Sequence, residues 1–313
     1  MDGFLNVLKP RGVTSHDVVM LARKFLREDR LGHLGTLDPL AVGVLPMACG
    51  TYRRLSEYFL GEDKRYFAEF TFGIRTDTGD TDGQVLEETD AEGLDPEVVR
   101  QALGSLTGKI LQTPPSYSAL KVKGKKLLDL ARQGIEVERE PREVAVHEFT
   151  LAGWIPGTRP RGLFSLRVGR GTYVRSLAFS LGETLGCGAT VSYLLRERSG
   201  KFLLRDSLTI SSLRKMAREG RGRQALCEPL SVMPPYPIFS LRPGSEVKVS
   251  HGVAVEAGDL CPVAPARAPG SGTGGIRFPY RAVVTMPDMR EIAAVVSVRE
   301  GGLFVYEKVL IAE

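Results

Sequence analysis

The chain has 313 residues and a formal net charge of +5, and 42% of its residues are hydrophobic. This length predicts about two domains with packed cores, and no apolar run reaches the roughly 18 residues that a membrane-spanning helix needs. The four cysteines lie far apart without a CxxC pair and the N-terminus has no secretory signal, so we expect no structural zinc site, no membrane contact and a cytoplasmic location.

The first two thirds of the chain predict strands and helices in mixed order. Residues 5–8 are expected to form a strand, followed by a helix over residues 14–28 with Thr14 or Ser15 at its N-cap. The remaining expected elements are helices over 51–60, 95–106, 125–133 and 172–185, and strands over 64–72, 144–151 and 163–168. Because no regular βαβ repeat appears, the pattern favours an α+β fold over a doubly wound sheet.

A change of composition near residues 232–237 predicts a linker rich in proline. Short strand-like segments follow it, at residues 246–249, 253–255, 282–285, 292–298 and 303–309. Their rhythm predicts a small β-barrel. We therefore expect one domain over residues 1–231 and a second over residues 232–313, with a loop rich in proline, alanine and glycine over residues 264–275.

Charge is unevenly distributed along the chain. Residues 196–223 contain nine basic and three acidic side chains, four lysines gather between residues 121 and 126, and acids concentrate between residues 77 and 97. Such polarity suits a polyanion partner. An ordinary solvated helix face also explains many charge runs.

Two segments match the formulas of known binding motifs but do not predict binding sites. Residues 270–275 satisfy the formula GxGxxG, but they follow no expected strand and open no helix. Residues 78–83 imitate a calcium-binding loop, but Thr78 and Thr89 stand where the first and twelfth ligands belong. A polar turn between two strands is the better interpretation of that segment. The sequence therefore predicts no metal and no nucleotide cofactor.

One stretch, GHLGTLDP at residues 32–39, presents a single carboxylate in a loop stiffened by its flanking residues. Pro39 restricts the backbone on both sides of its peptide bond, and the glycines permit tight turns. Asp38 could simply cap this turn, as aspartates often do. A lone, rigid carboxylate also suits a nucleophile better than an acid–base pair or a metal cage.

The longer string GHLGTLDPLAVGVLP, residues 32–46, resembles the active-site signature of the TruB family of pseudouridine synthases. Members convert a uridine in RNA to pseudouridine, and bacterial members act on uridine-55 in the T-loop of tRNA. The resemblance covers residues 4–205 in blocks. It implies Asp38 as the catalytic carboxylate, no cofactor, and a pseudouridine synthase fold with a mixed, mainly antiparallel sheet flanked by helices. A small RNA-binding, PUA-like β-barrel often follows in this family.

Two further strings resemble family motifs and supply the other candidate catalytic residues. Lys64-Arg65-Tyr66 resembles the motif whose tyrosine packs against the target uracil. GTYVRS, residues 171–176, implies that Arg175 binds Asp38 through two parallel hydrogen bonds and that Tyr173 lines the uracil pocket. The simpler alternatives are an ordinary half-buried strand tyrosine and a surface arginine.

The remaining candidates bind substrate or shape the site by resemblance. Leu194 is expected at the floor of the uracil pocket, His33 is expected to stack within the unfolded T-loop, and Lys9 belongs to a motif that shapes the site. PPSYSALKVKG, residues 114–124, resembles the RNA-clasping segment of bacterial members. We place that insertion at residues 112–142.

The implied reaction breaks the bond from N1 to C1′ of a uridine that has been flipped out of its loop, and rejoins the ring through C5. Asp38 could attack C6, attack C1′ or promote elimination at the ribose. The expected partner is tRNA alone, bound by a monomer without a protein partner. Two alternatives remain: a guide-RNA-dependent synthase of the dyskerin type, and an RNA-folding chaperone without turnover.

Overall fold

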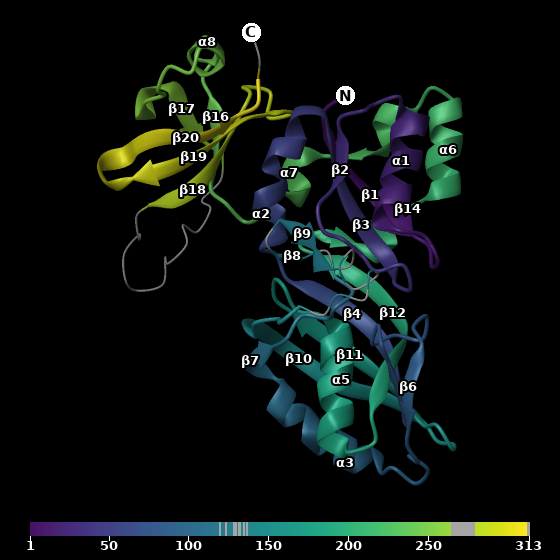
Figure 1. The fold of residues 1–313 in the computed structure, drawn as a ribbon. Coiled ribbons are helices and arrows are strands. Elements are labelled where there is room, and N and C mark those ends of the chain that lie inside the picture. Colours follow the sequence, from purple (N-terminus) through teal and green to yellow (C-terminus); the bar gives the residue numbers. More distant parts are fainter. Residues whose placement is uncertain are drawn as a thin grey trace.

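The computed structural model describes residues 1–263 and 279–311, apart from residues 119, 123, 128, 129, 131, 132, 134 and 136, and only the backbone of residues 121, 122, 125 and 126. Two sheets dominate the described residues (Figure 1). One has eleven strands and carries the segments around Asp38 and Arg175, while the other has five strands and lies near the C-terminus. No described helix is long and apolar enough to cross a membrane.

The large sheet runs through eight strands in hydrogen-bonded order, with three short strands attached at its side. In order these are β14 (Leu208–Thr209), β1 (Gly3–Lys9), β3 (Val42–Cys49), β12 (Ala189–Ser199), β4 (Lys64–Phe72), β11 (Arg161–Val168), β10 (Arg142–Ile155) and β7 (Gly108–Gln112). The attached strands are β2 (Leu31–His33), β13 (Phe202–Leu203) and β15 (Leu226–Cys227). Most neighbours are antiparallel, and among the described strands of this sheet the pairs β1–β14 and β3–β12 are parallel. The expected α+β class with a mixed, mainly antiparallel sheet is confirmed.

The alternation of side chains along β4 explains its central place. Residues of one face of β4, such as Tyr66, Phe70 and Phe72, are buried, as a period of two predicts. They pack against Phe164 of β11 and against residues of the helix that follows residue 173, in one hydrophobic core. This core therefore lies under the segment that carries Arg175.

Helices cover the sheet on its two halves (Figure 1). The helices are α1 (Ser15–Leu26), α2 (Ser56–Leu60), α3 (Pro96–Ala102), α5 (Val174–Leu185), α6 (Ile210–Arg218), α7 (Pro229–Val232) and α8 (Glu246–Ser250). Short 3₁₀ turns span Gly50–Leu55, Leu103–Leu106, Leu204–Asp206, Gly222–Ala225, Ala257–Asp259 and Glu300–Gly302. Helices α1 and α6 pack together over β1 and β3, whereas α3 and α5 lie over β4, β10 and β11.

Local signals set the ends of the helices near the expected site. Thr14, one of the two N-caps that the sequence allowed, caps α1 and exchanges hydrogen bonds with Asp17 in a capping box. Helix α5 begins at Val174, two residues later than expected, and Gly186 ends it in the left-handed conformation. Arg175 therefore lies in the first turn of α5, as predicted.

Two hairpins project from the large sheet. The first, β5 (Ile74–Thr76) with β6 (Val85–Glu88), encloses the polar turn that imitates a calcium loop, and the interpretation as a turn between strands is confirmed. The second pairs β8 (Lys121–Val122) with β9 (Lys125–Lys126). The helix expected over residues 125–133 is therefore wrong at its start, because Lys125 and Lys126 pair with the lysine-rich strand before them. Four residues of the remainder, 128, 129, 131 and 132, lie outside the described residues.

The five-stranded sheet has the order β17 (Leu260–Pro262), β16 (Ile238–Leu241), β18 (Tyr280–Thr285), β19 (Ile292–Arg299) and β20 (Leu303–Val309). The strand expected over residues 303–309 is confirmed, but the one expected over 246–249 is wrong. Those residues form α8, whose buried Val249 packs into the core of this sheet. The alternating valines of this short segment had predicted a strand. Residues 253–255 form no strand either, and the loop expected over residues 264–275 lies outside the described residues.

The two sheets meet at a shared hydrophobic cluster. Phe4, Tyr52 and Tyr58 from the large sheet and its helices pack with Val283 and Ile292 of the C-terminal sheet. The buried Tyr52 hydroxyl accepts a hydrogen bond of 2.8 Å from the backbone N–H of Ile292. Side-chain contacts thus fix the C-terminal sheet against the first one.

Candidate active site

The loop between β2 and β3 carries Asp38. Hydrogen bonds to backbone groups of this loop hold it in place. The hydroxyl of Ser15, at the start of α1, donates to the carbonyl of Leu37 at 3.0 Å and accepts from the N–H of Leu37 at 2.8 Å. The N–H of Ala41 donates to the carbonyl of Asp38 at 3.1 Å, which closes the turn around Pro39. The carboxylate of Asp38 remains one third exposed. A rigid backbone thus presents a partly open anion.

Arg175 meets this carboxylate with the geometry that the sequence predicted. Its Nε lies 2.9 Å from Oδ2 of Asp38, and its Nη2 lies 3.0 Å from Oδ1. Two of the other three N–H groups donate to the carbonyls of Thr78 and Tyr117, each at 2.8 Å. Because the guanidinium is 5% exposed and has a fixed acceptor on each side, it holds the carboxylate in one orientation.

A second carboxylate, Asp80, lies on the other side of Arg175. Its Oδ2 is 3.8 Å from Nη1 of Arg175, and its Oδ1 accepts from the Thr78 hydroxyl at 2.6 Å and from the Asp82 N–H at 3.2 Å. Sequence reasoning missed this residue because it had set aside the whole turn as a failed calcium loop. The signal that could have found it is the run of acidic residues itself, which supplies a counter-charge for a buried arginine.

Lys9 holds the same loop through hydrogen bonds to its backbone. Its ammonium is fully buried and donates to the carbonyls of Pro10, Pro39 and Ala41 at 2.9, 3.2 and 2.6 Å. Burial lowers the pKa of Lys9 to about 8, although the charge of Asp38 opposes this change. Lys9 therefore contacts the backbone on the C-terminal side of Asp38, which places it as a residue that shapes the loop.

Arg196 holds both ends of the loop, whereas from the sequence it was counted only within the basic run of residues 196–223. Its guanidinium, which is 1% exposed, donates to the carbonyls of Gly35, Thr36 and Val44 at 3.0, 3.2 and 2.8 Å. Parallel pairing of β12 with β3 brings Arg196 beside Gly43, where a Cβ would lie 2.3 Å from the Arg196 carbonyl oxygen. This close approach of two backbones requires glycine, and it puts the arginine under the loop.

Three apolar candidates come from strands and helix ends next to the loop. Tyr66 and Leu194 are buried in the same hydrophobic cluster as Leu37 and Leu40 of the Asp38 loop. Tyr173 directly precedes α5 and is half-buried. Tyr66 and Leu194 thus belong to the core that also contains residues of the Asp38 loop, and Tyr173 lies two residues before Arg175.

The segment that resembles an RNA clasp is tied to the site by its first residues. The Gln112 side chain accepts from the N–H of Tyr173 at 2.7 Å and donates to its carbonyl at 3.1 Å. The Ser176 hydroxyl donates to the Thr113 carbonyl at 2.9 Å. Since the carbonyl of Tyr117 accepts from Arg175, this segment closes over the arginine that holds Asp38.

His33 lies outside the cluster around Asp38. It lines a hollow of about 510 Å³ together with Arg30, Arg53 and Arg54. Burial lowers the pKa of His33, with a further contribution from Arg196, and its buried Nδ1 has no hydrogen-bond partner among the described residues. An imidazole ring in a basic hollow can stack on a nucleic-acid base.

The described residues include no group of three or more His, Cys, Asp or Glu side chains arranged to hold a metal ion. One partly exposed carboxylate is bound by a buried arginine, and two further buried cations donate to the backbone on its flanks. This arrangement can orient an anion toward a bound group with little motion.

Solved structures identify the fold. A chain of a Cbf5–Nop10–Gar1 complex matches with a TM-score of 0.73 and 26% sequence identity, over 99% of this chain and 85% of that chain. A chain of an archaeal box H/ACA Nop10–Cbf5 complex matches in fold with a TM-score of 0.72 at 23% identity, over 99% and 86% of the two chains. The fold is that of the pseudouridine synthases.

The sequence comparisons narrow this class. Residues 23–174 match the sequence model of the TruB family pseudouridylate synthase N-terminal domain. A curated tRNA pseudouridine synthase B of Symbiobacterium thermophilum is 46% identical, over 81% of this chain and 83% of the relative. Proteins of the same name from Moorella thermoacetica and Synechocystis are 45% and 41% identical, each over 83% of this chain and over 85% and 87% of the relative. The chain belongs to the TruB family of pseudouridine synthases.

Proposed function

We propose that the protein converts uridine-55 in the T-loop of tRNA to pseudouridine, with Asp38 as its catalytic carboxylate. The observation that carries this proposal is the partly exposed Asp38 bound at both oxygens by the buried Arg175. The names of its relatives support tRNA as the substrate. Family membership supports the reaction, an isomerisation that needs no net gain or loss of atoms or electrons.

The reaction has a balanced course at this site. The bond from N1 to C1′ breaks, the uracil turns, a bond from C5 to C1′ forms, the proton on C5 leaves and N1 gains a proton. The role proposed for Asp38 is to attack the nucleoside or to take a proton from it. The Arg175 guanidinium fixes its orientation, which lowers the cost of reaching the reactive geometry.

The buried residues next to the loop supply the slot for the base. A uridine must leave its stack to reach Asp38, and it needs an apolar surface in place of its neighbours. We assign Tyr66, Tyr173 and Leu194 to this slot, and to Tyr66 a proton transfer in addition. His33 is assigned to the basic hollow, where it stacks within the opened T-loop. Lys9 is assigned to the shape of the Asp38 loop.

The wider organisation belongs to the same proposal. We assign residues 1–231 to catalysis, with the insertion at about residues 112–142 as an RNA clasp, and residues 232–313 to a PUA-like RNA-binding domain. The separate five-stranded sheet supports the second assignment. The proposed enzyme acts in the cytoplasm as a monomer on tRNA alone, without guide RNA or a protein partner.

The test is incubation of the purified protein with an unmodified tRNA transcript, followed by carbodiimide mapping of pseudouridine. We expect product at position 55 without guide RNA, and none in a transcript with cytidine there. Asp38→Asn should bind the transcript but give no product. Tyr66→Phe should bind normally and turn over slowly, because the ring remains and the hydroxyl is lost. Product that requires a guide RNA, or full activity of Asp38→Asn, would contradict the proposal.

A further inference from the structure

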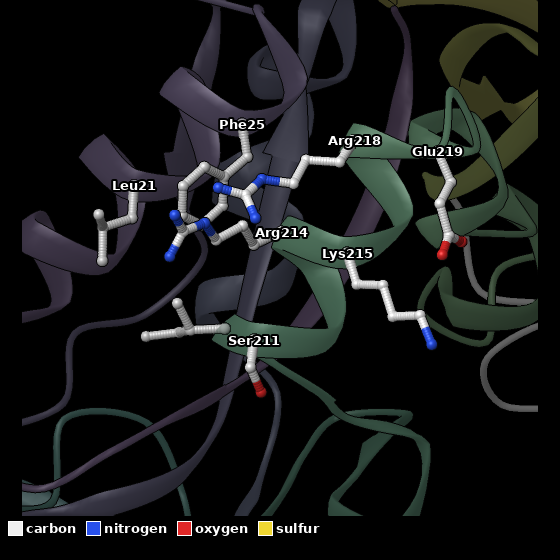
Figure 2. Close-up of a pocket in the computed structure, with 8 residues that line it drawn as sticks. Leu21, Phe25, Ser211, Arg214, Lys215, Arg218 and Glu219 are labelled. Atoms are coloured by element: carbon white, nitrogen blue, oxygen red, sulfur yellow. The ribbon is translucent and has the colours of Figure 1, made fainter.

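A hollow of about 630 Å³ lies between α1 and α6, and none of its lining residues belongs to the site described above. Leu21 and Phe25 form a ridge on α1, while Arg214 and Arg218 form a facing ridge on α6, each pair spaced by four residues. Figure 2 shows both arginine side chains extending from α6 toward Phe25. The hollow, here called the α1–α6 groove, thus joins an apolar wall to two neighbouring cations.

The α1–α6 groove has a strong positive bias. Lys215 also lines it, and the acid that lines it, Glu219, is bound by Arg221 through Nε at 3.1 Å and through Nη2. Among the described residues, neither Arg214 nor Arg218 forms an ion pair with an acid. Two like charges one helical turn apart repel each other, so an anion between them relieves an unfavourable contact.

Helix α1 connects this groove to the active-site loop. Its first residue, Ser15, exchanges two hydrogen bonds with Leu37, the neighbour of Asp38. At a rise of 1.5 Å per residue, Leu21 and Phe25 lie about 9 and 15 Å along the helix from Ser15. Successive nucleotides of one strand advance about 3.4 Å along the axis of a B-form duplex, so a span of this size along the axis corresponds to about three to five nucleotides.

We propose that the α1–α6 groove binds the phosphodiester backbone of the substrate RNA within about five nucleotides of the target uridine. The proposal rests on the proposed function, because it takes the uridine to be bound at Asp38. Arg214 and Arg218 contact phosphate oxygens, while Phe25 contacts a ribose or a base. An acidic protein segment would also suit the charge, but α1 is shared with the loop that receives RNA, which favours RNA.

The test pairs protein variants with neutralised phosphates. T-arm hairpins are made with a single uncharged methylphosphonate, placed in turn at each of five positions on either side of the uridine. Each hairpin is assayed for kcat and KM with the wild-type protein and with Arg214→Gln/Arg218→Gln. The matched control is Arg100→Gln/Lys109→Gln, which also removes two exposed cations but from pairs with Glu97 and Glu143.

We expect the groove variant to raise KM for the unmodified hairpin about tenfold at unchanged kcat, because two phosphate contacts are lost. At one or two positions the methylphosphonate should raise KM for the wild type and for the control, but not further for the groove variant. Such non-additivity identifies the phosphates that the arginines contact. Arg214→Lys/Arg218→Lys should restore most of the affinity, since charge alone is sufficient for a phosphate.

Additive effects at every position, or a groove variant with wild-type KM, would overturn the groove proposal while leaving the proposed function intact. A rise in KM that is equal in the control variant would overturn it too, because it would report net charge alone. Failure of the wild type to modify any hairpin or tRNA transcript would instead contradict the proposed function, and the groove proposal with it.

Discussion

The active-site loop and the α1–α6 groove use positive charge in opposite ways. Under the loop, Lys9, Arg175 and Arg196 are almost fully buried, and their donors meet backbone carbonyls or a carboxylate at hydrogen-bond distance. In the groove, Arg214 and Arg218 are exposed and have no acidic partner among the described residues. Buried cations with fixed acceptors define geometry, whereas exposed cations attract a partner over a longer range.

The burial of the first group has a physical consequence. A charge taken out of water is expensive unless hydrogen bonds replace its hydration. Arg196 meets this requirement with three carbonyls from the two ends of the Asp38 loop. Loss of such a cation therefore affects both the fold and the site, while loss of an exposed cation affects binding. The predictions below test this division, beginning with the largest expected effect.

Arg175→Ala should lower kcat by about 10²–10³, the usual effect of losing a donor that is fixed toward a reacting group. Asp38 would lose both hydrogen bonds of its carboxylate, and Asp80 would lose its nearby cation. Single-turnover assays with saturating enzyme would measure the chemical step. Arg175→Lys should recover part of the rate, because a point charge replaces a bidentate contact. A rate for Arg175→Ala within threefold of wild type would contradict the orienting role.

Arg196→Met should lower the free energy of unfolding by about 3 kcal/mol, because three buried carbonyls lose their donor. Urea denaturation followed by circular dichroism would measure the change. The control is Arg198→Met on the same strand, since Arg198 donates one hydrogen bond, to the Gly200 carbonyl, at 2.6 Å. Equal losses of unfolding free energy in the two variants would show that the loop contacts of Arg196 do not contribute to stability.

Lys9 predicts a pH dependence of stability. Burial lowers its pKa from 10.5 to about 8, so between these values the unfolded chain binds the proton that the folded chain has released. Stability rises with pH wherever the unfolded state binds more protons. The free energy of unfolding of the wild type, minus that of Lys9→Met, should therefore increase from about pH 8 to about pH 10.5.

Denaturation midpoints of the two proteins at half-unit pH steps would test this. Subtraction removes groups that titrate in both proteins, such as Lys64, whose pKa burial also lowers to about 8. Parallel pH profiles for the wild type and Lys9→Met would mean that the buried ammonium titrates normally.

The sequence predicted some of the active-site contacts but not all of them. The string around Asp38 and the motif around Arg175 carry enough specific residues to predict the family and the contact between the two side chains. Asp80 was missed because its turn was set aside as a failed calcium loop, and Arg196 was missed because its role depends on a tertiary contact. Arg196 reaches the loop through the parallel pairing of β12 with β3, and no local pattern encodes that register.

The C-terminal sheet shows the same limit at the level of elements. Residues 303–309, which are rich in valine and aromatic side chains, form β20 as predicted, whereas residues 246–249 form helix α8. The valines at positions 247 and 249 fit the strand period of two, but in α8 only Val249 is buried against the sheet and Val247 is exposed. The predicted helix over residues 125–133 failed at its start because Lys125 and Lys126 pair with a neighbouring strand.

Arg221→Gln gives the smallest expected effect and tests the exposed side of the comparison. Arg221 and Glu219 form an ion pair with side chains that are 47% and 40% exposed, so we expect a change in stability below about 0.5 kcal/mol. The variant also frees the Glu219 carboxylate at the rim of the α1–α6 groove, which should raise KM for the hairpin about two- to threefold at unchanged kcat. Glu219→Gln/Arg221→Gln should return KM to the wild-type value, because the free anion is then removed. A stability loss comparable with that of Arg196→Met would erase the distinction between buried and exposed cations.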